Sequence, residues 1–144
     1  MDGMQMANAL TEPKPRVGDS EKLTINLGVV DLGQIDLLVQ EGFYSNRSDL
    51  IRTAVRNLLA THAESVRQTV ARRTLMLGLQ HLSRTDLERA VAAGETLRIQ
   101  VVGLARIDDD VPPELALAAI GSVSVLGAFH ASPAVRQALA SRMV

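Results

Sequence analysis

Residues 22–27 alternate strictly between polar and apolar side chains. The apolar members are Leu23, Ile25 and Leu27, and the polar members are Lys22, Thr24 and Asn26. A period of two is typical of a half-buried strand. The spacing becomes helical directly afterwards, so the sequence offers this strand no hairpin partner. Because strand backbone groups need partners, we expect the same strand of a second copy to pair with it about a two-fold axis. The alternative is a lone edge strand with a solvated polar face.

Two short amphipathic helices are predicted after this strand. The first is expected to start at the N-cap Asp31 and to stop at Gly42. The second is expected to start at the N-cap Asn46, with Asp49 completing a variant of the capping box. The apolar stripe of the first helix is Leu32, Ile35, Leu38 and Val39, and that of the second is Leu50, Ile51, Ala54, Val55, Leu58 and Leu59.

The start of the second helix has the groups of a phosphate site. Free backbone N–H groups, the hydroxyl of Ser48 and the guanidinium of Arg47 lie together there. Taken alone, a capped helix with a surface arginine is commonplace. The order of the neighbouring strand, helix and turn strengthens the prediction of a phosphate site.

The succession of strand, short helix, glycine-containing turn and the segment "YSNRSDLIR" resembles the ribbon-helix-helix DNA-binding family, which includes the Arc and Met repressors and CopG-like regulators. The resemblance covers residues 20–62. It implies that two strands pair antiparallel across an intertwined dimer and enter the DNA major groove. By position, it implies that Lys22, Thr24 and Asn26 read bases and that Asn46, Arg47 and Ser48 hold phosphate.

Size also favours a dimer. A unit of about 45 residues with apolar stripes on both helices buries too little surface to fold alone. The second helix is expected to run on past His62, because Ala63, Val66 and Val70 keep the helical spacing. Residues 64–73 would then form a helical connector.

An internal repeat begins beyond Thr74. Its three glycine-centred copies are Leu77-Gly78-Leu79, Val102-Gly103-Leu104 and Leu126-Gly127-Ala128. After each copy come a helix-starting residue and a short helical pattern; the starting residues are Ser83, Asp108 and Ser132. Pro112, Pro113 and Pro133 suit first-turn positions. Gly94 and Gly121 are expected to end the first two helices.

This repeat predicts three strand-turn-helix units with parallel strands, each unit burying the next. The fold class is therefore α+β, a ribbon-helix-helix followed by a small C-terminal α/β region. The alternative is a compact α/β domain whose periodicity is partly accidental. The last copy would expose an end that needs a cap or a partner, which favours self-association.

Composition narrows the function classes. The absence of cysteine excludes disulfides, thiol catalysis and thiolate metal sites. A net charge of −1 means that DNA binding must rest on local placement of charge. The run Asp108–Asp110 could bind Ca²⁺ or Mg²⁺, but capping and solvation explain it more simply. His62, His81 and His130 share no motif. No P-loop, dinucleotide or zincin pattern occurs, so we expect no enzymatic activity, no cofactor and no metal site. No apolar run is long enough to span a membrane, so we expect no membrane partner.

The organisation expected from sequence has four parts: a flexible arm over 1–19, a DNA-binding domain over 20–63, the connector over 64–73 and the repeat domain over 74–144. The expected function is that of a cytoplasmic, nucleoid-associated, repressor-like regulator of transcription. Its partners would be double-stranded DNA and a second copy, with a tetramer or higher assembly through residues 74–144. The alternatives are an antitoxin whose C-terminal region binds a protein partner, and a DNA-associated scaffold protein.

Overall fold

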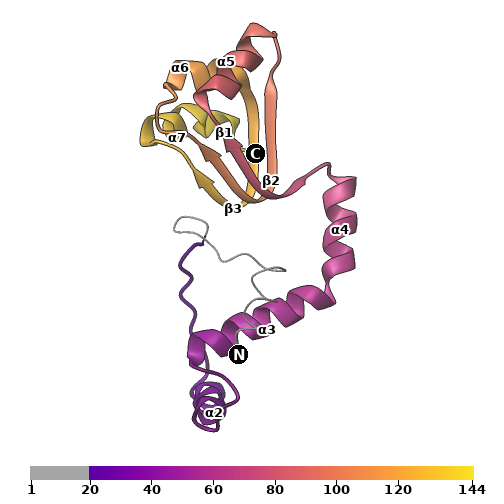
Figure 1. The fold of residues 1–144 in the computed structure, drawn as a ribbon, viewed down its shortest axis with the longest axis vertical. Helices are drawn as coiled ribbons and strands as arrows, with labels where there is room; N and C mark the ends of the chain where they lie inside the picture. Colours follow the sequence, from indigo (N-terminus) through magenta and orange to yellow (C-terminus); the bar gives the residue numbers. More distant parts are fainter. Residues whose placement is uncertain (1–19) are drawn as a thin grey trace, which may run out of the picture.

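The computed structural model describes residues 20–144, so the arm expected over 1–19 lies outside the described residues. Helices α2, α3 and α4 come first, followed by three strands that alternate with helices α5, α6 and α7 (Figure 1). The bounds of the first helices are Val29–Gln40 for α2, Arg47–Thr61 for α3 and Ala63–Arg72 for α4. The sheet part consists of β1 Met76–Leu82, α5 Arg84–Ala92, β2 Leu97–Ile107, α6 Pro113–Ala119, β3 Ile120–His130, α7 Pro133–Leu139 and the short 3-10 helix η1 Ala140–Arg142.

Helix α2 begins earlier than the sequence indicated. Its N-cap is Gly28, whose carbonyl accepts from the N–H of Leu32, so the prediction of Asp31 as N-cap is wrong. Asp31 lies inside the first turn instead, where its negative charge interacts favourably with the positive end of the helix dipole. The predicted stop is confirmed. Gly42 has φ +85°, and the N–H groups of Gly42 and Phe43 donate to the carbonyls of Val39 and Leu38 in a Schellman motif.

The predicted start of α3 is confirmed. The side chain of Asn46 accepts from the N–H of Asp49 at 2.8 Å. The reciprocal bond of the capping box is displaced by one residue, because the Asp49 carboxylate accepts from the N–H of Ser45 at 2.9 Å. Both bonds satisfy backbone donors that the first turn of a helix cannot pair internally.

The expected run-on of α3 past His62 is wrong in one respect. His62 adopts φ −100° and ψ 12°, so the helical segment breaks there and α4 continues in a new direction (Figure 1). The apolar spacing across the break is preserved, which is why the sequence pattern reads as one helix.

The sheet contains three parallel strands in the order β1-β2-β3. Helix α5 connects β1 to β2 and packs on α6, and α6 connects β2 to β3 and packs on α7. The predicted parallel strand–helix units are therefore present. Right-handed crossovers between successive neighbouring strands place all the connecting helices on one face of a sheet.

The apolar core lies between this sheet and its helices. The fully buried members on the strands are Ile99, Val101, Ala105, Ile107, Ile120 and Val123, and those on the helices are Leu87, Ala116, Ala119, Val135 and Leu139. In contrast, α2, α3 and α4 have no buried residue. Within the described chain, the core therefore belongs to the sheet part alone.

Three glycines align across the sheet and form what we call the glycine row. Gly78 pairs with Gly103, and Gly103 with Gly127, at φ +134°, +139° and +123° respectively. A Cβ on Gly103 would lie 2.0 Å from the carbonyl oxygen of Gly78, and a Cβ on Gly127 would lie 2.1 Å from that of Gly103. Glycine is thus required at the repeat's centre for its backbone angle and for the close approach of the neighbouring strand.

The helix caps of the sheet part agree with the sequence in two units and differ in one. Ser83 makes a full capping box with Asp86, and Ser132 accepts from the N–H of Val135 at 3.3 Å. Asp108 does not cap α6, whose N-cap is Pro112, so that prediction is wrong. Three residues, 109–111, separate Asp108 from Pro112, and Pro113 then takes the first helical position.

Of the two helix stops predicted within the sheet part, Gly94 and Gly121, only Gly94 is confirmed. Gly94 has φ +69° and its N–H donates to the carbonyl of Val91. Gly121 instead lies within β3, which begins directly after α6. A Cβ there would come within 2.6 Å of Cγ2 of Thr96, so the glycine makes room for a neighbouring chain segment.

Candidate nucleic-acid interface

The segment 22–27 has no strand partner within the described chain. Residues 21–28 belong to no helix or strand, and Lys22, Thr24 and Asn26 are exposed. Leu23 and Ile25 line a cavity of about 510 Å³ together with Ile51 and Val55 of α3. Leu23 is nevertheless 83% and Ile25 51% exposed, so a single chain covers neither side of this segment. The pairing of its backbone is left to another molecule or to solvent.

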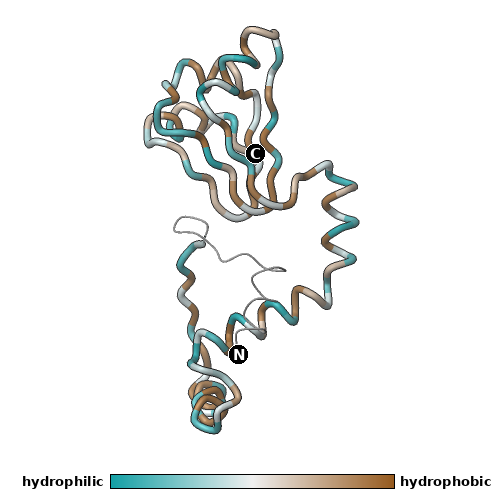
Figure 2. The backbone as a smooth tube through the Cα atoms, viewed as in Figure 1, coloured by the Kyte–Doolittle hydropathy of each residue, from teal (hydrophilic) through white to brown (hydrophobic). Residues whose placement is uncertain are grey.

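The helices beside this segment expose apolar side chains that one chain does not cover. On α2, Val29 is 84% and Leu37 is 57% exposed, and on α3, Leu58 is 61% exposed. Figure 2 shows apolar residues along most of α2. Apolar surface of this extent on a helix is normally buried against another element. The predicted apolar face of α3 is therefore present but remains uncovered in a single chain.

Arg47, a predicted phosphate ligand, makes a bidentate ion pair with Asp36 of α2. The distances are 2.7 Å from Nε to Oδ1 and 2.8 Å from Nη2 to Oδ2. The hydrogen bonds from Arg47 hold the pKa of Asp36 below its ordinary value, and the same bonds raise the pKa of Arg47. The pair connects α2 to the first turn of α3. Sequence reasoning missed it, because no local pattern signals a contact between residues on two helices separated by a turn.

The N-terminus of α3 has the remaining features of an anion site. Ser48 lies in the first turn and lines the same cavity as Lys22, together with Arg52 and Arg56 of the following turns. The amide oxygen of Asn46 is used by the N–H of Asp49, so Asn46 acts here as a cap. The structure therefore brings Lys22 and Ser48 to one cavity and places Arg47 beside α2.

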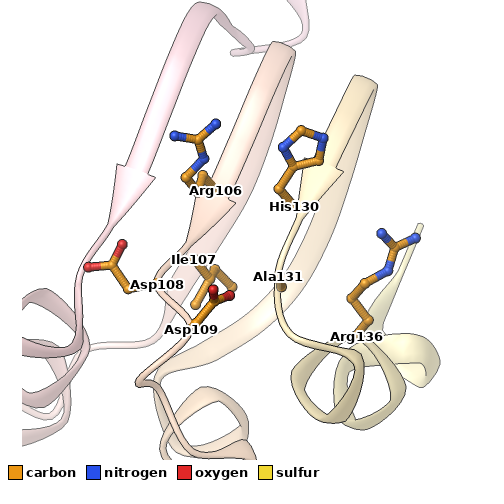
Figure 3. Close-up of a pocket in the computed structure, with 7 residues that line it drawn as sticks. All are labelled: Arg106, Ile107, Asp108, Asp109, His130, Ala131 and Arg136. Atoms are coloured by element: carbon orange, nitrogen blue, oxygen red, sulfur yellow. The ribbon is translucent and has the colours of Figure 1, made fainter. Parts of the chain in front are cut away.

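A second cavity, of about 430 Å³, lies at the carboxyl ends of β2 and β3. In Figure 3, Arg106 and His130 project from neighbouring strands, Asp109 follows β2, and Arg136 extends from α7. Arg136 donates to the carbonyl of Phe129 at 3.1 Å. Positive and negative groups are mixed along its wall, so this cavity has no single charge sign.

The histidines of the sheet part pair with acids. His81 lies 2.5 Å from Asp108, and His130 lies 2.9 Å from Glu21 of the N-terminal segment. Residues 20–144 contain no group of three or more acidic or histidine side chains able to hold a metal ion. No helix among these residues is long and apolar enough to cross a membrane.

The chain was compared with protein families, curated proteins and solved structures. The model of the ribbon-helix-helix transcriptional regulator family matches residues 18–136, which include the segment 22–27, α2, α3 and the whole sheet. No curated protein and no solved structure matches the chain. The match extends far beyond the 20–62 that carried the resemblance in the sequence. The matched residues make up more than half of the chain, and the chain belongs to the ribbon-helix-helix transcriptional regulator family.

Proposed function

We propose that the chain is a sequence-specific, repressor-like regulator that inserts a dimeric two-stranded ribbon into the DNA major groove. Family membership supports DNA binding and dimerisation in general. The observation that supports the finer proposal is the segment 22–27, which has no strand partner within the described chain. Its apolar side chains Leu23 and Ile25 line a cavity with α3 yet are 83% and 51% exposed, so both the strand and its apolar side await a partner. A two-stranded antiparallel ribbon of this kind fits the width of the major groove.

In this proposal the dimer forms by exchange of apolar surface. The segment of each copy pairs with that of its partner, and the exposed side chains of α2 and α3 pack against the same helices of the other copy. Two-fold symmetry makes this contact self-complementary. It also places two sets of Lys22, Thr24 and Asn26 on one face of the ribbon, in opposite directions, as a palindromic site requires.

Each of the three polar side chains has a defined chemistry toward bases. The amide of Asn26 can contact the N6 and N7 atoms of adenine, Thr24 can contact the methyl group of thymine, and Lys22 can donate to guanine. The first turn of α3, with Asn46, Arg47 and Ser48, would position the protein on phosphate. Because Arg47 is paired with Asp36, we assign the most direct phosphate contact to the backbone N–H groups and the hydroxyl of Ser48, with Arg47 adding charge.

Replacing Asn26 tests the base-reading role. We expect Asn26→Ala to relax sequence preference by about 1–3 kcal/mol at the contacted position while affinity for random DNA stays nearly unchanged. Sites should be selected from a randomised duplex pool with the wild type, and both proteins then measured on the selected and on random duplexes. Asn57→Ala, an exposed asparagine of α3, is the matched control. An equal loss on selected and random DNA would contradict base reading by Asn26.

The folded C-terminal part bears on the alternatives. An antitoxin tail is often disordered until it binds its partner, whereas residues 76–142 form a sheet with its own apolar core. This supports assembly or sensing by a folded unit. We therefore propose that residues 74–144 connect DNA-bound dimers into a larger assembly.

A further inference from the structure

The outer edges of the sheet are unpaired over most of their length within residues 76–144. On the outer side of β3, Met143 forms a parallel bridge with Val123, and the N–H of Val144 donates to the carbonyl of Val123 at 2.8 Å. Strand β1 pairs only with β2. Exposed strand edges present rows of unpaired N–H and C=O groups and are templates for another strand.

The two edges match in length and register. Strand β1 pairs with residues 101–107 of β2, and residues 101–106 of β2 pair with 125–130 of β3. A further strand added to β3 in the same register would therefore lie along 125–130. The bridge with Met143 is at Val123, so it stops just before this stretch. Residues 125–130 therefore have no strand partner on this side, and this is the part that β1 would fit. Two side-chain contacts already lie along it, from Arg136 to the carbonyl of Phe129 and between Glu21 and His130.

The glycine row supplies the second argument. Twice within the chain, a glycine with positive φ receives the carbonyl of the glycine on the preceding strand against its Cα. Gly78 has the same backbone angle, but no heavy atom lies within 4 Å of the position of its Cβ. Gly78 thus has the geometry to continue the row and has no neighbour in this chain with which to do so.

Side chains beside the glycines form a third matching feature. Leu77, Val102 and Leu126 align across the sheet, and we call them the aliphatic row. Leu77 is 61% and Leu126 is 54% exposed. Continuation of the sheet would place Leu126 beside Leu77 of another copy, in the relation that each already has to Val102. The apolar side chains of parallel strands are normally buried. The proposed contact would bury part of the apolar surface that is now exposed to solvent.

We propose that β1 of a second copy extends the sheet, pairing in parallel with residues 125–130 of β3 and placing its Gly78 beside Gly127. The proposal deepens the assembly role stated above and rests on it. The contact joins two different edges, so it is heterologous and does not close on itself in a pair. Each ribbon-helix-helix dimer would contribute two sheets, and the contact would connect neighbouring dimers into a chain or ring.

The test uses the full chain and two single substitutions, Leu77→Glu and Leu126→Glu. We expect the wild type to grow beyond the mass of a dimer as its concentration rises in light scattering, and each variant to remain a dimer. Leu117→Glu on the central helix α6, where the side chain is 37% exposed, is the matched control and should assemble as the wild type does. Wild type that stays a dimer at all concentrations overturns the proposal, as does unaffected growth in either variant.

Mixing separates this contact from a symmetric one. Leu77→Glu retains an intact β3 edge, and Leu126→Glu retains an intact β1 edge, so a mixture of the two should grow although neither does alone. The chain carrying both Leu77→Lys and Leu126→Glu should also assemble, because the opposite charges meet only between copies. Restored growth also shows that the substituted sheets are folded. A mixture that remains dimeric overturns the heterologous contact and favours a symmetric edge or face.

DNA binding is measured on the same proteins to keep the two proposals apart. On a duplex with one selected site, both glutamate variants should bind like the wild type, and on a duplex with adjacent sites they should lose cooperativity. Loss of single-site binding in every protein, wild type included, would count against the DNA-binding proposal and leave the mass measurements to decide the sheet contact. Retained cooperativity in variants that remain dimers would overturn the sheet contact as the connection between sites.

Discussion

Asp36 and Arg47 form a bidentate ion pair between α2 and α3. Such a fork fixes the orientation of both groups, which a single lysine–carboxylate contact does not. The pair is solvent-exposed, so its energetic contribution is limited by screening. Its main consequence is positional, because it holds the first turn of α3 against α2.

Acidification should weaken this pair. The pKa of Asp36 is lowered by its hydrogen bonds with Arg47, so its contribution to stability is complete above the ordinary aspartate pKa and is lost as pH falls through the folded value. We expect Asp36→Asn to be less stable than wild type near neutrality, with the difference vanishing at low pH. Urea midpoints measured across the acid range check this. Glu41→Gln, at the C-cap of α2, is the control.

We expect loss of the pair by substitution of Asp36 to strengthen DNA binding although it lowers stability, because the proposed phosphate contact lies at the same first turn of α3. Asp36→Asn removes a negative charge near the expected backbone contact and releases the guanidinium of Arg47. We expect tighter binding to all sequences and a steeper dependence on salt, and for Arg47→Ala weaker binding and a flatter dependence, by up to about one unit of log–log slope. The DNA affinity of the wild type and both variants, measured at several salt concentrations, tests these expectations. If Arg47→Ala leaves the slope unchanged, Arg47 acts on α2 alone.

At the scale of elements, the glycine row sets the shape of the sheet. All three members need a positive φ, but only Gly103 and Gly127 also receive a carbonyl at a distance that a Cβ would occupy. A side chain at Gly103 or Gly127 would therefore meet both backbone strain and steric overlap, whereas a side chain at Gly78 would meet the strain alone. Substituting glycines in different strands therefore separates the energetic cost of strain from that of overlap.

We expect Gly103→Ala to destabilise the sheet by about 4 kcal/mol, combining strain of about 1–3 kcal/mol with a similar cost of overlap. Gly78→Ala should cost only the strain, because nothing lies within 4 Å of its Cβ position. Unfolding of the full chain by urea, at a concentration low enough to avoid assembly, gives both values. Equal losses at the two positions would show that the backbone angle alone selects glycine.

At the scale of the whole molecule, the described chain has two parts with different means of stabilisation. Residues 76–142 have their own core, while α2 and α3 have no buried residue. The second part must therefore gain its stability from another copy. Its melting temperature should depend on protomer concentration even at concentrations too low for the sheets to assemble, and that of the sheet part should not change in this range.

Leu58→Asp tests this division. Leu58 is 61% exposed in one chain, and a substitution at such a surface position usually changes stability by less than about 0.5 kcal/mol. If the apolar face of α3 is buried in a dimer, we expect loss of dimerisation and of DNA binding, measured by light scattering and anisotropy. Val91→Asp on α5, also exposed, is the control. A dimeric, DNA-binding Leu58→Asp protein would contradict the proposed interface.

The sequence by itself determined the features that depend on local spacing. Alternation over 22–27, the glycine stop at Gly42, the cap at Asn46 and the glycine-centred repeat are all set by residues close together in the chain. The last of these also predicted parallel strands, because a unit that repeats with one crossover each time can stack in only one direction. Family membership followed from the order of these local signals.

Tertiary structure decided what depends on contacts between distant residues. The pairing of Asp36 with Arg47, the use of Asp108 by His81 and the position of Gly121 against Thr96 each depend on elements meeting in space. Neither residue spacing nor propensity contains that information. The break at His62 and the matching open edges of β1 and β3 belong to the same class. A pattern along the chain specifies which face of an element is apolar, and only packing specifies what covers it.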